Sequence, residues 1–275
     1  MKFLVEEDPF LRFSLFSGSD NLYLLHAHEI LGAFVFYQLI YAYFAPWFNR
    51  LVFRGGYTSI GDRKTKINFD IHTVSNVQCV ITFWSIAPTL LLPMNLSVVS
   101  YQNDLASMAS ALAVGYFLWD LFICMRYYSL YGFEFLAHAL SSLYVFTLGL
   151  KPFCQSWIGK FLLFEASTPF VNNNWFIAQL SKSSSKSIVP EWFNIVNGVL
   201  LLGTFFSVRI LWGFIAISIL LCQMWKERHE IPLAQSGILL LLNVLLNTLN
   251  LFWFNKMLRL AKKMVSRSSA SAKNM

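Results

Sequence analysis

The stretch MASALAVGYFLWDLFICM, residues 108–125, contains one charged side chain, Asp120, in an otherwise apolar or small-residue run. About 20 such residues, wound as an α-helix, cross the hydrocarbon core of a bilayer. The stretch therefore predicts a membrane-spanning helix. The whole chain shares this character, because 56% of its 275 residues are hydrophobic and only 13% are charged, against about 25% in a typical soluble domain.

Six further apolar segments approach the same length, and we expect each to be helical. With residues 108–125 they predict an all-α, multi-pass transmembrane helix bundle of about seven spans, in a range of about six to eight. The six segments are 29–47, 74–93, 135–150, 157–178, 194–221 and 237–255.

Two of these segments are irregular. Segment 157–178 includes Glu165 and Pro169, which predicts a broken or re-entrant helix and leaves open whether it fully crosses the bilayer. Segment 194–221 is longer than a span needs and has Arg209 near its middle, so we expect it to be tilted, kinked or partly interfacial.

Lysine and arginine are unequally shared between the two sides that seven alternating spans define. One side holds 14 of these residues and the other holds 6, with Arg209 inside a span. Because basic residues concentrate in cytosolic loops, this asymmetry predicts a luminal N-terminus and a cytosolic C-terminus. The 14 lie in loop 48–73, at Arg126, Lys182 and Lys186, and in residues 256–275; the 6 are Lys2, Arg12, Lys151, Lys160, Lys226 and Arg228.

The chain ends and loops add three expectations. The N-terminal MKFLVEEDPFLRF lacks the pattern of a cleaved signal peptide. Asn95 begins the sole glycosylation sequon, NLS, in a predicted luminal loop, but so close to the membrane that its occupancy stays open. The tail 259–275 is basic and then Ser-rich, so we expect a solvated, partly disordered cytosolic end that contacts anionic lipid.

Several function classes find no support. HExxH, GxSxG, P-loop and clustered Cys/His patterns are missing, so the sequence predicts no metal site and no cofactor. The net charge of +7 is explained by the positive-inside bias, and we expect no nucleic-acid partner. Three histidines near span ends are interpreted as interfacial, namely His26, His28 and His229. The four cysteines are scattered, with no disulfide pattern, and are read as small apolar residues: Cys79, Cys124, Cys154 and Cys222.

Polar side chains inside predicted spans are costly and normally face the interior of the bundle. Asp120 and His138 lie on consecutive spans, so we expect them on facing helices, joined by a direct or water-bridged hydrogen bond. One interpretation makes them a catalytic pair, in which the carboxylate fixes the tautomer of the imidazole base. The other makes them helix–helix hydrogen-bonding partners without chemistry.

Arg209 is the most expensive of these residues. Three roles are open for it: an ion pair with Asp120 or Glu165, binding of a lipid phosphate or carboxylate, or extension to the membrane–water interface. Asn243, Asn247 and Asn250 form a stripe that interhelical hydrogen bonding explains.

The stretch NFDIHTVSNVQC, residues 68–79, lies where a basic loop meets the second span. His72 and Asn76 are one helical turn apart, and Gln78 lies on an adjacent face. This pattern allows contact with lipid headgroups, or it is simply the polar start of a helix.

Five stretches in order carry a family resemblance: NFDIHTVSNVQ, GYFLWDLFICMRYY, GFEFLAHALSSLYVF, FEASTPFVNNNWFI and VNGVLLLGTFFSVRI. Together they resemble the TLC domain, the membrane module named for its TRAM, Lag and CLN homologues. The resemblance divides the chain into residues 1–63 (luminal N-terminus, first transmembrane helix and basic cytosolic loop), the TLC domain at 64–258, and the cytosolic tail 259–275.

The segment E-x-S-x-P-F-x-N, at residues 165–172, is similar to that of small fungal TLC-domain proteins rather than ceramide synthases. Ceramide synthases carry two adjacent histidines for acyl transfer from acyl-CoA. Here the resemblance supplies His138, but Ala139 stands in the second place. Asp120 occupies the acidic position of the family, and Gln78 stands where many relatives have a histidine.

The resemblance implies a multi-pass protein of the endoplasmic reticulum that binds or handles a membrane lipid and contributes to lipid homeostasis. The expected lining of its site is His138, Asp120, Glu165, Asn172 and Arg209, with His72 and Gln78 as further lipid- or substrate-binding residues. The alternative is an acyl-CoA-dependent acyltransferase related to ceramide synthase, with His138 as the base and acyl-CoA as co-substrate. The residues leave open whether the chain is catalytic and whether it forms a homo-oligomer.

Overall fold

The computed structural model describes residues 7–151, 153–182 and 189–273, with side chains as far as residue 263. Its described residues form helices and connecting turns, without any strand, which confirms the all-α bundle.

Two of the basic residues counted above, Lys2 and Lys186, lie outside the described residues. Seven helical passes are present in the described part of the chain: α2–α3 (27–53), α5 (Arg63–Ile86), α6 (Asp104–Arg126), α7 (Tyr128–Leu148), α8–α9 (158–182), α10–α11 (191–226) and α12 (Leu233–Lys273).

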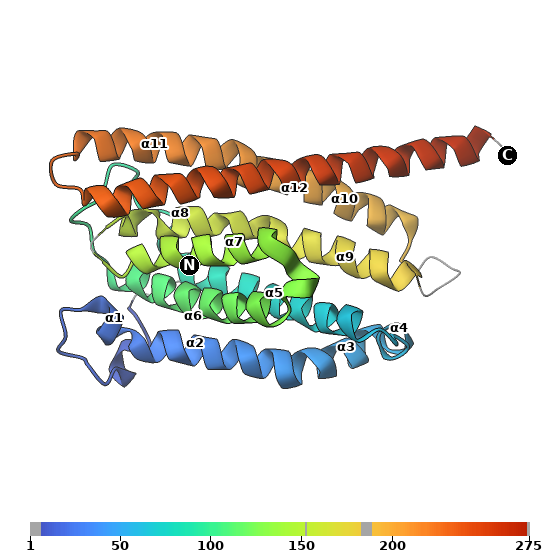
Figure 1. Ribbon diagram of the computed structural model, residues 1–275, viewed down its shortest axis with the longest axis horizontal. Coiled ribbons are helices and arrows are strands. Elements are labelled where there is room, and N and C mark those ends of the chain that lie inside the picture. Colours follow the sequence, from blue (N-terminus) through green and yellow to red (C-terminus); the bar gives the residue numbers. More distant parts are fainter. Residues whose placement is uncertain (1–6, 152, 183–188, 274–275) are drawn as a thin grey trace.

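Four of these passes are long and apolar enough to cross a membrane: Ala27–Phe53, Asp104–Arg126, Glu191–Lys226 and Leu233–Lys263. The other three, α5, α7 and α8–α9, are helices of the same bundle, in or near the predicted segments. Figure 1 shows α10, α11 and α12 along one side of the bundle and α2–α3 along the opposite side, with the remaining passes between them.

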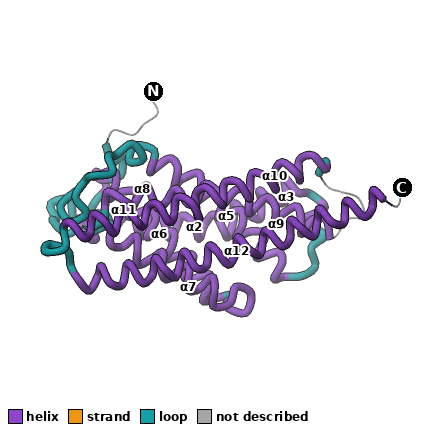
Figure 2. Tube along the Cα trace, turned by 90° about the horizontal axis from the view of Figure 1, so that it is seen from above, coloured by secondary structure: helices purple, strands orange, loops and turns teal. Residues whose placement is uncertain are grey.

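The passes alternate in direction, so their connections gather at two ends of the bundle (Figures 1 and 2). At one end, Cys154 donates its backbone N–H to the carbonyl of Val98 and Ser97 donates its hydroxyl to Glu227. This end also holds α1 (Leu22–Leu25), whereas α4 (Gly55–Thr58) and the C-terminal end of α12 lie at the other. The Asn95 side chain is exposed in the connection 87–103.

The boundaries of α5 differ from the prediction of 74–93. The helix begins early because Asp62 caps it, accepting hydrogen bonds from the backbone of Lys64 and Thr65. The hydroxyl and backbone N–H of Thr65 hold the pKa of the Asp62 carboxyl below its ordinary value. The helix ends at Ile86, two residues before a proline at 88 that has no backbone N–H to continue the helical hydrogen bonds.

The tail also differs from its prediction. The backbone of α12 continues as a helix to Lys273, rather than becoming disordered after 258. Extending an existing helix avoids the cost of nucleation, and the Lys, Arg, Ala and Met residues of the tail are good helix formers.

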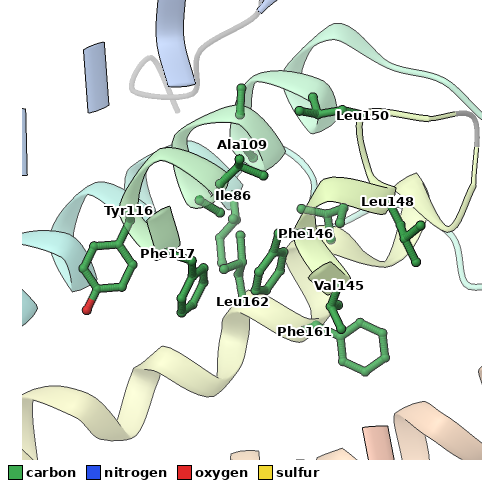
Figure 3. Packing of buried hydrophobic residues seen from close by; sticks show 14 of the residues in the cluster. Ile86, Ala109, Tyr116, Phe117, Val145, Phe146, Leu148, Leu150, Phe161 and Leu162 are labelled. Carbon is green, nitrogen blue, oxygen red and sulfur yellow. The ribbon is translucent and has the colours of Figure 1, made fainter. Parts of the chain in front are cut away.

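Helix α6 is the central helix of the bundle, buried along most of its length. At its N-terminal half it packs against α2 with almost no space between the backbones. A Cβ added to Gly115 would lie 2.5 Å from the carbonyl oxygen of Ile30 and 2.6 Å from Cβ of Ala33. Close helix contacts through small residues are typical of membrane bundles. On the other face of α6, Phe117 stacks on Phe146 of α7 with ring centroids 5.3 Å apart (Figure 3).

Two passes depart from regular α-helix where sequence irregularities predict it. Between α8 (Ile158–Leu162) and α9 (Thr168–Lys182), residues Leu163–Ser167 form a 3₁₀ turn that carries Glu165. Between α10 (Glu191–Phe205) and α11 (Trp212–Lys226), residues Phe206–Leu211 form a π-helical turn that carries Arg209. The predicted break in 157–178 is confirmed, whereas in 194–221 the structure shows a π-helical turn within one continuous pass.

Candidate functional site

Arg209 is buried in the bundle and paired there. Its Nη2 lies 3.5 Å from Glu165 Oε1, with the two side chains 10% and 14% exposed. A hydroxyl of the 3₁₀ turn adds a further contact, because Nε donates to Ser167 Oγ at 2.9 Å. Thr168 Oγ1 accepts from Nη2 and itself donates to the other oxygen of Glu165 at 2.7 Å. Of the two partners that the sequence suggested for Arg209, the structure selects Glu165 over Asp120.

This pairing depends on the irregular turns. A π-helical turn widens the helix locally and is frequent at functional sites, while a 3₁₀ turn narrows it. Here the two turns lie side by side and carry the opposite charges of one ion pair. The Nη1 atom of Arg209 makes none of the hydrogen bonds found among the described residues, so it keeps donor capacity for another group.

His138 projects from α7 into the same region. Its ring lies edge-on to Trp253 of α12, at 5.5 Å between centroids, and edge-on to Phe117 of α6, at 6.4 Å. The Nδ1 atom is buried and lacks a hydrogen-bond partner among the described residues. A buried polar atom without a partner is uncommon and marks a place where a ligand or water belongs.

The structure does not join Asp120 to His138 by a direct hydrogen bond, contrary to that part of the prediction. Helix α6 presents Phe117, one turn before Asp120, to the His138 ring. Residues 117 and 120 are rotated by about 60° and displaced by about 4.5 Å along a helix, which separates the carboxylate from the imidazole.

The asparagine stripe of α12 completes the site. The amide of Asn247 donates to Asn243 Oδ1 at 2.7 Å. This hydrogen bond lies within α12, whereas the sequence interpretation expected a bond between two helices. Asn243 and Asn250 are buried. The three asparagines line the same cavity as His138, and their helical spacing is the signal of this in the sequence.

We call this cavity the Arg209 cavity. It has a volume of about 50 Å³, and side chains from five of the seven passes line it. Its lining is Phe117, His138, Ser142, Val145, Phe146, Phe161, Leu162, Phe164, Glu165, Arg209, Asn243, Leu246, Asn247 and Asn250. The apolar part of this lining from α6, α7 and α8 is seen in Figure 3.

His72 and Asn172 meet each other away from the Arg209 cavity. Asn172 of α9 donates its amide to Asn76 Oδ1 at 2.8 Å and to the carbonyl of His72 at 3.3 Å. The His72 ring stacks on Trp175 with centroids 4.1 Å apart, and its Nδ1 lies 2.7 Å from the carbonyl oxygen of Asn68. Neither residue lines the cavity. These hydrogen bonds and the ring stack hold α5 against α9.

Gln78 is also outside the cavity lining. Its amide donates to Thr82 Oγ1 at 2.7 Å, one turn further along α5, while its Oε1 is buried without a partner among the described residues. The structure therefore places three of the expected lining residues together, His138, Glu165 and Arg209, and leaves the other four outside: Asp120, His72, Gln78 and Asn172.

The fold and the cavity define a class of protein: an all-α, multi-pass membrane bundle with a polar site enclosed by its helices. The chain belongs to the TLC domain family, which matches residues 68–259. The match confirms the resemblance found in the sequence.

Relatives with the same domain cover nearly the whole chain. The chain is 51% identical to topoisomerase I damage affected protein 4 of Saccharomyces cerevisiae, over 96% of this chain and 94% of the relative. It is 34% identical to a TLC domain-containing protein of Schizosaccharomyces pombe, over 85% and 78%, and 30% identical to TLC domain-containing protein 4 of Homo sapiens, over 90% and 92%. No solved structure matches.

Proposed function

We propose that this TLC-domain protein binds a membrane lipid by its polar headgroup in the Arg209 cavity and thereby contributes to membrane lipid homeostasis. The observation that carries the proposal is that the Arg209 cavity, whose lining is otherwise mostly apolar, contains polar groups with hydrogen-bonding capacity to spare. His138 Nδ1 is buried without a partner among the described residues, and the hydrogen bonds of Arg209 found there use Nε and Nη2 rather than Nη1. The asparagines of α12 lie in the same lining. Lipid headgroups supply the oxygen and nitrogen atoms that such groups bind.

The size of the cavity limits what it holds. A buried water needs about 10–15 Å³ of such volume, so 50 Å³ admits a few waters or one end of a headgroup. The acyl chains would then lie along the apolar outer faces of the helices. Binding by the polar end alone favours selection by headgroup chemistry over selection by chain length.

Acyl transfer from acyl-CoA, the alternative drawn from ceramide synthases, receives no specific support. A base is activated by a partner that orients it, and none of the carboxylates in the described residues hydrogen-bonds to His138.

We expect His138→Ala to lower the amount of specifically bound lipid about 2–10-fold, the effect of losing one net hydrogen bond of about 0.5–1.5 kcal/mol. The measurement is lipid mass spectrometry of the protein purified without added lipid, beside thermal stability. His229→Ala, at an exposed position in the connection after α11, is the control. A wild-type lipid profile equal to the bulk membrane, or equal binding by both variants, contradicts the proposal.

We also propose that the protein resides in the endoplasmic reticulum with its N-terminus luminal and its C-terminus cytosolic. The 14-to-6 distribution of basic residues supports the orientation, and membership of the TLC domain family supports the location. We expect proteases added to sealed microsomes to remove a C-terminal tag and to spare an N-terminal one. A protected C-terminal tag would overturn the orientation.

A further inference from the structure

A second polar cluster lies at the start of the first membrane pass, apart from the Arg209 cavity. His26 precedes α2 (Ala27–Leu39), and Glu29 lies in its first turn. Asp8, which is distant in the sequence, folds back against them. The side chains of all three are only 1% exposed. Phe10 N donates to Asp8 Oδ1 at 2.8 Å, which orients the carboxylate and leaves Oδ2 free to face His26. The Phe10 carbonyl oxygen lies 2.9 Å from His28 Nε2, which holds the returning segment against α2.

The ligand atoms of this cluster lie within 4.8 Å of one another, near the separations between ligands of one metal ion. His26 Nδ1 lies 2.9 Å from Glu29 Oε1 and 3.7 Å from Asp8 Oδ2. His28 Nε2 lies 3.5 Å from the same oxygen of Glu29. Ligands held about 2.0–2.2 Å from a tetrahedral zinc ion are about 3.3–3.6 Å from one another. Small side-chain shifts would complete such a shell.

The cluster also contains unsatisfied atoms. Asp8 Oδ2, His26 Nε2, His28 Nδ1 and Glu29 Oε2 are all buried and have no hydrogen-bond partner among the described residues. The hydrogen bond between His26 and Glu29 leaves Asp8 Oδ2 without a partner, although this oxygen faces His26 Nδ1. Two carboxylates buried beside each other are costly unless positive charge compensates them.

We propose that Asp8, His26 and Glu29 bind a divalent transition-metal ion of the zinc type, with His28, once released from the Phe10 carbonyl, as a fourth ligand. Imidazole nitrogen with carboxylate oxygen is a ligand set that zinc accepts, and two carboxylates neutralise its charge. The bound ion would fasten the N-terminal segment to α2, adding to the hydrogen bond between His28 and the Phe10 carbonyl.

The ion would also form part of a pocket wall. An apolar pocket of about 390 Å³ opens beside the cluster, and both His28 and Glu29 line it together with Phe10, Tyr37 and Trp84. This pocket supplies a path by which an ion or its water reaches the cluster from outside.

The sequence alone did not reveal this site. His26, His28 and Glu29 form the short run HAHE, which matches no established metal motif, and Asp8 joins them only through the fold. We therefore expected interfacial histidines and no metal.

The full chain, purified in detergent with a tag that contains no histidines and without chelator, is analysed for metal by mass spectrometry. We expect about one zinc ion per chain, or the same occupancy after incubation with zinc chloride and removal of free ion. Cobalt added to chelator-treated protein should produce the visible absorption of tetrahedral cobalt. A chelator should lower the melting temperature, because a ligand of the folded state stabilises it.

Glu29→Gln is the decisive variant, because glutamine keeps the size and hydrogen-bonding capacity of the side chain and removes its charge. We expect at least about a tenfold loss of bound metal and no effect of chelator on its melting temperature, consistent with the loss of a ligand. His26→Ala should behave alike, and His229→Ala, outside the cluster, should retain the metal. The proposal is overturned if the wild type stays metal-free after zinc incubation, or if Glu29→Gln and His26→Ala both keep the ion.

Discussion

Arg209→Leu lowers the free energy of unfolding by about 3–5 kcal/mol, the loss found when one partner of a buried ion pair is removed. The reason is that Glu165 stays behind in the bundle without its positive partner, while Ser167 and Thr168 lose the donors that they accept from. We expect a matching fall in folded yield. Equilibrium unfolding in mixed detergent and SDS micelles measures the change.

Two further variants show whether the loss of stability comes from breaking the ion pair or only from removing a large side chain. Arg228→Leu removes an exposed arginine and should change the free energy of unfolding by less than about 0.5 kcal/mol. The double change Arg209→Leu with Glu165→Leu removes both charges, and it should recover part of the loss because no unpaired charge remains. Equal stability of Arg209→Leu and the wild type would mean that Arg209 is not held as a buried pair.

Gly115→Leu forces α2 and α6 apart, and we expect a loss of folded protein comparable with that of Arg209→Leu. Even a Cβ atom would lie within 2.6 Å of the α2 backbone and of Ala33, where no flexible side chain can move aside. Overpacking a core costs typically about 1–3 kcal/mol, and more where backbone must move. Thermal unfolding and monodispersity in detergent measure the effect.

Gly203→Leu is the matched control for this prediction. Gly203 lies in α10 with no atom within 4 Å of an added Cβ, and it is exposed on the outer face of the bundle. Leucine is also a better helix former than glycine, so this variant should be as stable as the wild type or slightly more stable. If both leucine variants fold equally well, α2 and α6 do not pack closely at Gly115.

The resemblance and the observed cavity agree on His138, Glu165 and Arg209, and the reason is energetic. A charge or an imidazole in a membrane span is too costly to face lipid, so such residues identify the interior of the bundle from composition alone. The same reasoning failed for His72 and Asn172, because a polar residue can face inward and yet serve only to join two helices.

The sequence by itself determined that this protein is a helical membrane bundle of the TLC domain family, since long apolar runs and ordered motifs are local properties. It also predicted the irregular turns around Glu165 and Arg209. Only the tertiary structure decided which polar groups meet. The rotation of α6 about its axis places Phe117, rather than Asp120, against His138. The N-terminal segment folds back so that Asp8 lies beside His26. Such meetings depend on the relative rotation and translation of packed helices, which spacing along one helix does not specify.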